Sequence, residues 1–225
     1  MAVILRGGAV FLHIPKTGGT WVTSVLRDTG LFRCSIGHRH ANWPHLLAPG
    51  YQGVGRKVEN LYKRSAYLRT SPKPFTFCFV RHPLAWYESF YRYKSQAHLN
   101  WERDGDSRDW NRWHPNSILN GLGEGNTFDE FVENVIDAYP GYVSALFSYY
   151  TLPPVDFIGK QETLTDDLLT VLEETGQRFD EKAIREAAPV NQSKSAGGGI
   201  EWDPVLRERV LALEAAALQR FGYTE

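Results

Sequence analysis

The chain has 225 residues, of which 42% are hydrophobic and 23% are charged, which is the composition of a globular protein rather than a disordered one. A formal net charge of −1 gives no general attraction for nucleic acid or an anionic membrane, so an anionic ligand needs local cations. The length predicts one large domain over residues 1–225, and two cysteines, Cys34 and Cys78, are too few for a disulfide framework.

The start of the chain gives no sign of membrane targeting. Residues 1–8 hold too short an apolar stretch for a signal peptide, and no run of 18 apolar residues occurs in the sequence. We therefore expect no membrane span and a cytoplasmic location. A luminal domain that had been trimmed of its leader would have the same sequence features.

The first predicted elements are a strand, a glycine-rich turn and a helix. Residues 9–14 form a short apolar run typical of a buried strand, and the turn-forming residues 15–20 follow it. Apolar residues then recur at helical spacing over 21–27, and Gly30 is expected to end this helix. Residues 31–36 are a candidate second strand that leads into a histidine-rich segment.

Residues 75–80 are the clearest strand in the sequence. Because this run is apolar on both faces, we expect a central parallel strand in which Cys78 is buried. Arg81 follows it, and a proline in the first turn suits a helix over 83–96. Residues 97–126 then have the composition of a long polar loop, and loops of this length are often functional.

The last part of the chain predicts further alternation of strands and helices. Thr127 and Glu130 fit a capping box, which indicates a helix that reaches about Ala138. Three elements follow, namely a strand over 155–158, a helix over 163–175 that Gly176 closes, and a helix over 203–221 that Asp203 caps. Strands that alternate with helices predict a three-layer α/β fold, with a central, mainly parallel sheet flanked by helices.

The turn after the first strand has the composition of an anion site. Gly18 and Gly19 let the backbone approach an oxyanion closely, and the amides from Thr17 to Thr20 can converge on it. Lys16 adds a positive charge, and the two threonines add hydroxyl donors. An ordinary strand–helix connection with capping threonines has the same pattern, since glycine-rich turns are weak motifs.

Residues 13–20, with the sequence His-Ile-Pro-Lys-Thr-Gly-Gly-Thr, resemble the 5′-phosphosulfate loop of sulfotransferases that use 3′-phosphoadenosine 5′-phosphosulfate (PAPS). They look closest to the carbohydrate branch, of heparan-sulfate and Golgi type, whereas Trp21 is more similar to the cytosolic branch. Residues 79–91 resemble the family's 3′-phosphate motif, in which Arg81 is followed eight residues later by Ser89.

Two looser matches and one departure complete the resemblance. Residues 157–167 are similar to the family's late strand–helix segment, and residues 221–223 fit its closing Phe-Gly-Tyr. His82 stands where the family usually has Asp or Asn before the proline. The matches span most of the chain in the family's order.

The resemblance implies a P-loop-like α/β enzyme that transfers a sulfuryl group from PAPS to a hydroxyl acceptor. Lys16 would stabilise the leaving bridging oxygen, and Arg81 with Ser89 would bind the 3′-phosphate. The alternatives are an ion pair of Arg81 with Glu88 and a plain surface position for Ser89. The implied donor-binding residues are Lys16, Thr17, Gly18, Gly19, Thr20, Trp21, Arg81 and Ser89.

Two other function classes remain open from the sequence. A P-loop kinase has its lysine after the glycines and an Asp after an apolar strand to hold magnesium. Here Lys16 precedes both glycines and the strongest strand ends in Arg81, so we expect no metal. The second alternative is a non-catalytic relative that binds nucleotide or glycan.

The histidine-rich segment supplies candidates for the base that accepts the proton of the acceptor hydroxyl. Gly37-His38 resembles a Gly-His step of carbohydrate sulfotransferases, so His38 is the first candidate and His40 the second. These histidines are alternatively solvated loop residues, or zinc ligands together with His45. Glu88, His82 and Glu59 are further candidate bases, whereas His13 is expected to be structural.

The acceptor is expected to be a carbohydrate or another small molecule, with no nucleic acid. Trp101, Trp110 and Trp113, mixed with arginines, have the composition of an acceptor-binding lid, to which His45 would add a contact. The tryptophans alternatively cover the core. Lys194 lies where relatives have a nucleotide-covering loop, and a solvated connector is the alternative there.

Overall fold

The computed structural model describes residues 2–36, 40–42, 74–95, 114–123, 127–152, 155–190 and 200–224. The strands are β1 (Ala2–Leu5), β2 (Val10–Leu12), β3 (Phe32–Ile36), β4 (Thr76–Val80) and β5 (Phe157–Lys160). The α-helices are α1 (Gly19–Asp28), α4 (Pro83–Lys94), α5 (Phe128–Ala138), α6 (Tyr142–Thr151), α7 (Leu164–Glu174), α8 (Glu181–Arg185), α9 (Pro204–Leu213) and α10 (Ala215–Phe221). Two short 3-10 helices are η1 (Pro115–Leu119) and η2 (Gln161–Thr163). Within these ranges, no helix is both long and apolar enough to cross a membrane.

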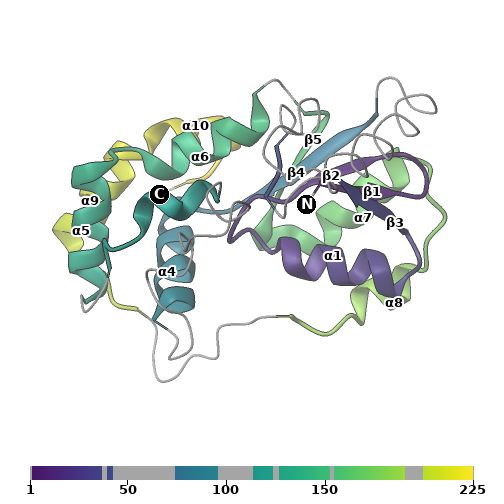
Figure 1. Cartoon of the computed structure of the whole chain (residues 1–225), viewed down its shortest axis with the longest axis horizontal. Coiled ribbons are helices and arrows are strands. Elements are labelled where there is room, and N and C mark those ends of the chain that lie inside the picture. Colours follow the sequence, from purple (N-terminus) through teal and green to yellow (C-terminus); the bar gives the residue numbers. More distant parts are fainter. Residues whose placement is uncertain are drawn as a thin grey trace, which may run out of the picture. The chain divides into compact units, whose positions relative to one another are not determined.

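The five strands form one mixed sheet in the order β3-β1-β2-β4-β5 (Figure 1). β4 lies between β2 and β5 and is parallel to both, whereas β1 is antiparallel to both of its neighbours, β2 and β3. Every residue of β4 is buried, as its apolar faces predict. The predicted α/β fold, with a central sheet that is parallel around β4, is therefore confirmed.

The sequence prediction missed β1. This strand pairs with β2 as a tight hairpin, in which Ala2 lies opposite Leu12. The turn needs Gly8, whose φ of 92° lies in the left-handed region that favours glycine. Four residues are too few to show a hydrophobic period, so only the pairing reveals the strand. The strand predicted at 31–36 occurs as β3, and the one predicted at 155–158 occurs two residues later as β5.

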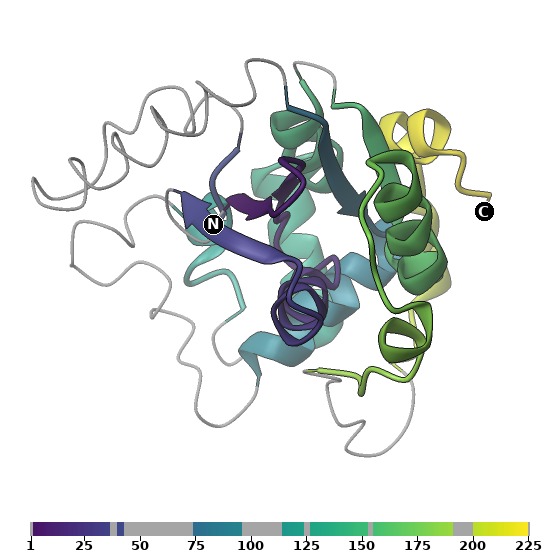
Figure 2. The ribbon, with the colours of Figure 1, turned by 90° about the vertical axis from the view of Figure 1, so that its right-hand side faces the viewer.

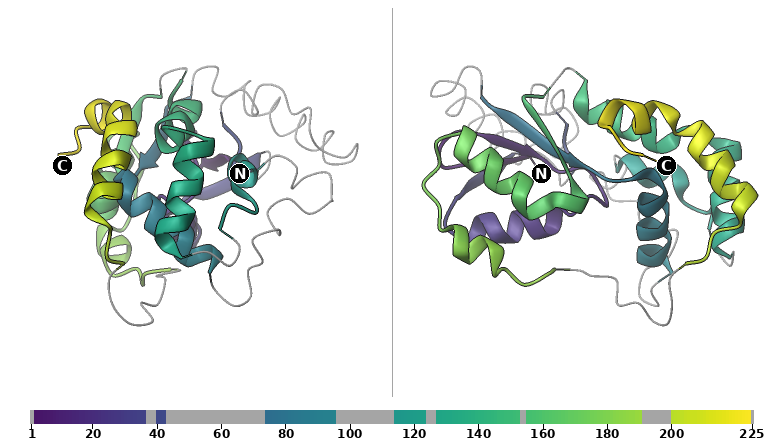
Figure 3. Two further views of the ribbon diagram at one scale, coloured as in Figure 1. Left: turned by 90° about the vertical axis from the view of Figure 1, so that its left-hand side faces the viewer. Right: turned by 180° about the vertical axis from the view of Figure 1, so that it is seen from behind.

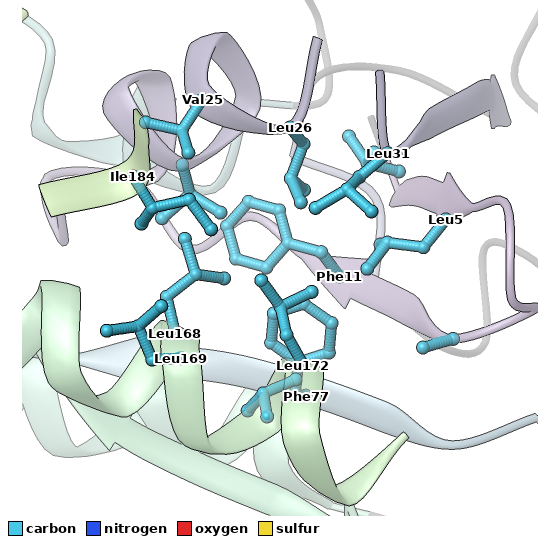
Figure 4. Packing of buried hydrophobic residues seen from close by; sticks show 14 of the residues in the cluster. Leu5, Phe11, Val25, Leu26, Leu31, Phe77, Leu168, Leu169, Leu172 and Ile184 are labelled. Atoms are coloured by element: carbon cyan, nitrogen blue, oxygen red, sulfur yellow. The ribbon is translucent and has the colours of Figure 1, made fainter. Parts of the chain in front are cut away.

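One core joins the sheet to α1, α7 and α8. Phe11 of β2 and Phe77 of β4 stack at a ring-centroid distance of 5.3 Å among leucines and valines of α1 and α7 and Ile184 of α8 (Figure 4). Figure 2 shows α1 nearly end-on, with α7 and α8 in green beside it. The two helices predicted from apolar spacing, at 21–27 and 163–175, therefore bury the faces that this spacing indicated.

The chain divides into two compact units. The first unit holds residues 1–80 and 149–191 and contains the whole sheet, and the second holds 81–148 and 192–225. In the second unit α4, α5 and α9 contact one another (Figure 3, left). Its core is aromatic, with Trp86 stacked on Phe90 at 5.2 Å. The single domain expected over residues 1–225 stays a prediction.

Two of the predicted helix starts are present with their hydrogen bonds. At α5 the Thr127 hydroxyl accepts from the Glu130 N–H, and the Glu130 carboxylate accepts from the Thr127 N–H at 2.8 Å. The pKa of Glu130 is lowered, because its carboxylate accepts hydrogen bonds from the backbone N–H and the hydroxyl of Thr127. At α9 the Asp203 carboxylate accepts from the Leu206 N–H at 2.8 Å. Local sequence patterns therefore predicted the starts of α5 and α9 correctly.

The helix predicted over 203–221 is in fact two helices, α9 and α10, separated at Glu214. The Glu214 side chain is fully buried and its carboxylate accepts from the backbone N–H groups of Val143 and Ser144, at 2.9 and 2.7 Å. It also accepts from the Ser144 hydroxyl and from the Tyr87 hydroxyl at 3.0 Å. Burial and this carboxylate raise the pKa of Tyr87 well above its ordinary value, so Tyr87 stays a donor. Glu214 thus caps α6 from a distant part of the sequence, and the sequence prediction missed α6 as well.

We expect Glu214→Ala to lower the free energy of unfolding by about 3–5 kcal/mol, because it leaves several buried donors without an acceptor. Tyr87→Phe removes one of these donors and should cost about 1 kcal/mol. Urea unfolding followed by tryptophan fluorescence measures both effects. Glu208→Ala, at an exposed position of α9, is the matched control and should stay within about 0.5 kcal/mol. A loss of less than about 1 kcal/mol in Glu214→Ala would contradict the capping role.

Candidate active site

The predicted anion site is a turn between β2 and α1 in the first unit. β2 ends at Leu12 and α1 begins at Gly19, so residues 13–18 make the turn. Lys16 has a φ of 68° and Gly18 a φ of 81°, which turn the backbone sharply. Gly18 is the N-cap of α1 and has no side chain to cap the first amides, so an anion can take that role. The local geometry agrees with the predicted loop for an oxyanion.

Thr17 supports the loop from within. Its hydroxyl donates to the Ile14 carbonyl at 3.0 Å, and its side chain is fully buried. Because a hydroxyl has a single hydrogen to donate, this contact leaves the backbone amide of Thr17 as its donor to a ligand. Trp21 is likewise buried and belongs to the core cluster under α1, so its ring serves packing.

Gly19 is required by the packing of His13. A Cβ atom built on Gly19 would lie 2.0 Å from Cδ2 of the His13 ring. His13 is buried, stacks on Phe11 at 5.9 Å and lies 4.8 Å from the His40 ring. This packing is what a structural role for His13 predicts, and the ring sets how closely α1 begins beside the loop.

We expect Gly19→Ala to lower the free energy of unfolding by about 1–3 kcal/mol, because a rigid, packed ring blocks the new methyl group. His13→Ala opens space at the same point, so the double variant His13→Ala/Gly19→Ala should lose less than the sum of the two single variants. Chemical denaturation of the four proteins measures this coupling. Additive losses would mean that the ring does not restrict residue 19.

His40 lies against the residue that begins this loop. Its Nδ1 is 3.1 Å from the His13 carbonyl oxygen, which can only accept, so Nδ1 carries the hydrogen. In a neutral ring this leaves Nε2 as the basic nitrogen. The Tyr150 hydroxyl donates to the His40 carbonyl at 2.7 Å, and the Asn42 side chain donates to the Tyr149 carbonyl at 3.1 Å. Residues 40–42 are thus held in place by α6.

The residues predicted to bind a 3′-phosphate lie in the second unit, at the start of α4. Arg81 directly follows β4 in the chain, and Ser89 is a buried residue of α4. His82 is the N-cap, and its Nδ1 accepts from the Leu84 N–H at 3.2 Å. The imidazole therefore performs the capping that Asp or Asn performs in other proteins, which accounts for the departure at position 82.

Glu88, a further candidate base, is engaged in other contacts. Its Oε1 accepts from the Trp202 indole N–H at 3.0 Å, and its Oε2 lies 3.5 Å from the Arg92 guanidinium. Trp202 also packs on Phe128 at 4.7 Å. The sequence analysis did not single out Trp202, because nothing local links it to a glutamate more than a hundred residues earlier.

Several predicted site residues lie outside the described residues. They are His38, His45, Glu59, Trp101, Trp110, Trp113 and Lys194. Between 97 and 126, the described stretch 114–123 is not the polar loop that we expected, since it contains η1 with Asn116 and Leu119 buried. No three His, Cys, Asp or Glu side chains gather in the described part of the chain, and the zinc alternative at His38, His40 and His45 involves residues outside it.

Comparison with known proteins gives a family for nearly the whole chain. No curated protein matches it. A model of the sulfotransferase family matches residues 6–223, a span that includes the turn before α1, His82 at the start of α4 and the closing residues after α10. The chain therefore belongs to the sulfotransferase family.

Proposed function

We propose that this sulfotransferase uses PAPS as its donor and transfers the sulfuryl group to a hydroxyl group of a carbohydrate. The turn before α1 is the observation that carries the donor assignment. Its glycine N-cap, its sharp backbone at Lys16 and Gly18 and the lysine charge suit a terminal phosphosulfate. The family match over residues 6–223 supports sulfuryl rather than phosphoryl transfer.

The two anionic ends of the donor would be bound by different residues. The 5′-phosphosulfate would lie on Lys16 and the amides of Thr17, Gly18, Gly19, Thr20 and Trp21. The 3′-phosphate would be bound by Arg81 and Ser89, of which the guanidinium offers a permanently charged, forked donor. Lys194 remains a proposed contact to the nucleotide.

The reaction would be an in-line displacement at sulfur. The acceptor oxygen forms a bond to sulfur while the bond from sulfur to the bridging oxygen breaks, and 3′-phosphoadenosine 5′-phosphate leaves. Lys16 would stabilise the negative charge that develops on the bridging oxygen. A histidine base, His38 or His40, would take the proton of the acceptor hydroxyl. In a neutral His40 ring whose hydrogen is on Nδ1, the nitrogen that would accept this proton is Nε2.

The proposal of a carbohydrate acceptor rests on the family resemblance and on the aromatic residues Trp101, Trp110 and Trp113. His45 is proposed as a further acceptor-binding residue. Aromatic faces suit the apolar faces of sugar rings. Incubation of the enzyme with PAPS and a panel of sulfate-free glycans and phenols, followed by mass spectrometry, identifies the acceptor class. Sulfation of the phenols alone would overturn the carbohydrate assignment.

We expect 3′-phosphoadenosine 5′-phosphate to bind about 10- to 100-fold more tightly than AMP, since a charge-assisted contact contributes about 1.5–3 kcal/mol. Isothermal titration calorimetry measures both affinities. Arg81→Ala should remove most of the difference, whereas EDTA should leave it unchanged. Equal affinity for the two nucleotides would refute the 3′-phosphate assignment. Tighter binding of ATP that requires magnesium would instead favour a kinase.

A further inference from the structure

We propose that Tyr223 is a positioning residue for the 3′-phosphate of the donor and that it acts through His82. This inference rests on the proposed function, because it takes Arg81 and Ser89 as the groups that bind this phosphate. Tyr223, His82 and both of these groups belong to the second unit, so the relevant contacts lie within one compact part of the chain.

His82 is joined to the first turn of α4 at two atoms. Its Nδ1 accepts from the Leu84 N–H at 3.2 Å, and its carbonyl oxygen accepts from the Trp86 N–H at 2.9 Å. The orientation of the imidazole therefore helps to set the geometry at which α4 begins. Arg81 is the preceding residue and Ser89 lies on the same helix, so this geometry also directs both phosphate ligands.

The Tyr223 ring holds the imidazole in this orientation. The two rings meet edge to face, with centroids 5.2 Å apart and planes at 75°. Tyr223 is itself fixed by the end of α10, where Gly222 has a φ of 61° and the Tyr223 N–H donates to the Leu218 carbonyl at 2.9 Å. The end of α10 thus holds the Tyr223 ring in place, and this ring in turn holds the capping side chain of His82.

Histidine needs such support more than the usual capping residues do. Asn, Asp and Ser are the preferred N-caps, because their short side chains reach the first amides with few competing rotamers. An imidazole can rotate away from the amide, and the edge-to-face contact with a second ring restricts that rotation. The contact with Tyr223 therefore converts a poor capping residue into an ordered one.

The test compares the affinities of 3′-phosphoadenosine 5′-phosphate and AMP, whose ratio reports the contribution of the 3′-phosphate. We expect Tyr223→Leu to lower this ratio about 3- to 10-fold with little change in AMP affinity. Tyr223→Phe keeps the ring and should keep the ratio. A role in stability alone would change both affinities together or neither of them.

Phe221→Leu is the matched control. Phe221 makes an edge-to-face contact of the same kind in the same C-terminal segment, but with Phe147, at 5.8 Å and 74°. Its replacement should cost stability without changing the affinity ratio. Equal falls in the ratio for Phe221→Leu and Tyr223→Leu would show a general loss of structure and would overturn the positioning role.

A double variant tests whether Tyr223 changes the affinity ratio through the N-cap residue His82. His82→Asn keeps a capping acceptor and needs no ring support, so adding Tyr223→Leu to it should leave the ratio unchanged. If Tyr223→Leu does not fold, His82→Ala removes the cap itself and should give the same fall in the ratio. An unchanged ratio in His82→Ala would overturn the inference.

Different results would refute the assignment of the donor and the role of Tyr223. A parent enzyme that binds AMP as tightly as the bisphosphate would refute the donor assignment, and this inference would fail with it. A parent that discriminates between the nucleotides, together with a Tyr223→Leu variant that discriminates equally well, would leave the donor assignment intact and refute only the role of Tyr223.

Discussion

Replacing Lys16 by alanine is expected to lower kcat by about 10²–10³, the usual cost of removing a group that stabilises developing charge. Donor affinity should fall much less, since the interaction strengthens as negative charge moves onto the bridging oxygen. Single-turnover kinetics with saturating PAPS and calorimetry with 3′-phosphoadenosine 5′-phosphate separate the two effects.

Lys16→Arg is the matched variant, because it keeps a positive charge on the same backbone. We expect it to retain more turnover than Lys16→Ala. A loss of donor affinity as large as the loss of kcat/KM, with kcat unchanged, would mean that Lys16 only binds the ground state.

Removing the base is expected to cost about 10²–10⁴ in turnover while nucleotide affinity stays nearly unchanged. His38→Ala is the first variant to measure and His40→Ala the second, with His45→Ala beside them. Activity should also fall at acid pH in the parent enzyme, because a protonated imidazole cannot accept the hydroxyl proton.

His40 needs a variant that separates chemistry from structure, because its Nδ1–H donates to the His13 carbonyl. His40→Asn retains a side-chain N–H for this carbonyl but has no basic nitrogen. Turnover that collapses in both His40→Ala and His40→Asn, but survives in His38→Ala, would move the base to His40. Full activity in all these variants would exclude both histidines, with Glu59 and Glu88 the next candidates.

Features that depend on neighbouring residues could be predicted from the sequence. The capping box of Thr127 and Glu130 and the buried strand at 76–80 follow from local chemistry and from an apolar run. The turn before α1 was also evident, because proline and glycines that follow an apolar run are typical of a turn. The positive φ at Lys16 was not evident, since lysine rarely adopts it.

Features that depend on distant partners could not be predicted. Glu214 looks like one more surface charge on a helix, and its burial makes sense only beside Ser144 and Tyr87. The indole of Trp202 on Glu88 and the hydroxyl of Tyr150 on the His40 carbonyl are of the same kind. Each joins residues about 70 to 130 positions apart, at which distance sequence spacing carries no information.

The left-handed backbone at Lys16 limits how far the thermal stability of this enzyme can be raised without loss of activity. A side chain in the left-handed region costs about 1–2 kcal/mol relative to glycine, so Lys16→Gly should relax the turn and raise the melting temperature. A library screened for heat resistance alone would therefore enrich glycine at the position that the proposed chemistry needs as lysine. Directed evolution of this protein has to select for turnover and thermal tolerance together, because at residue 16 the two oppose each other.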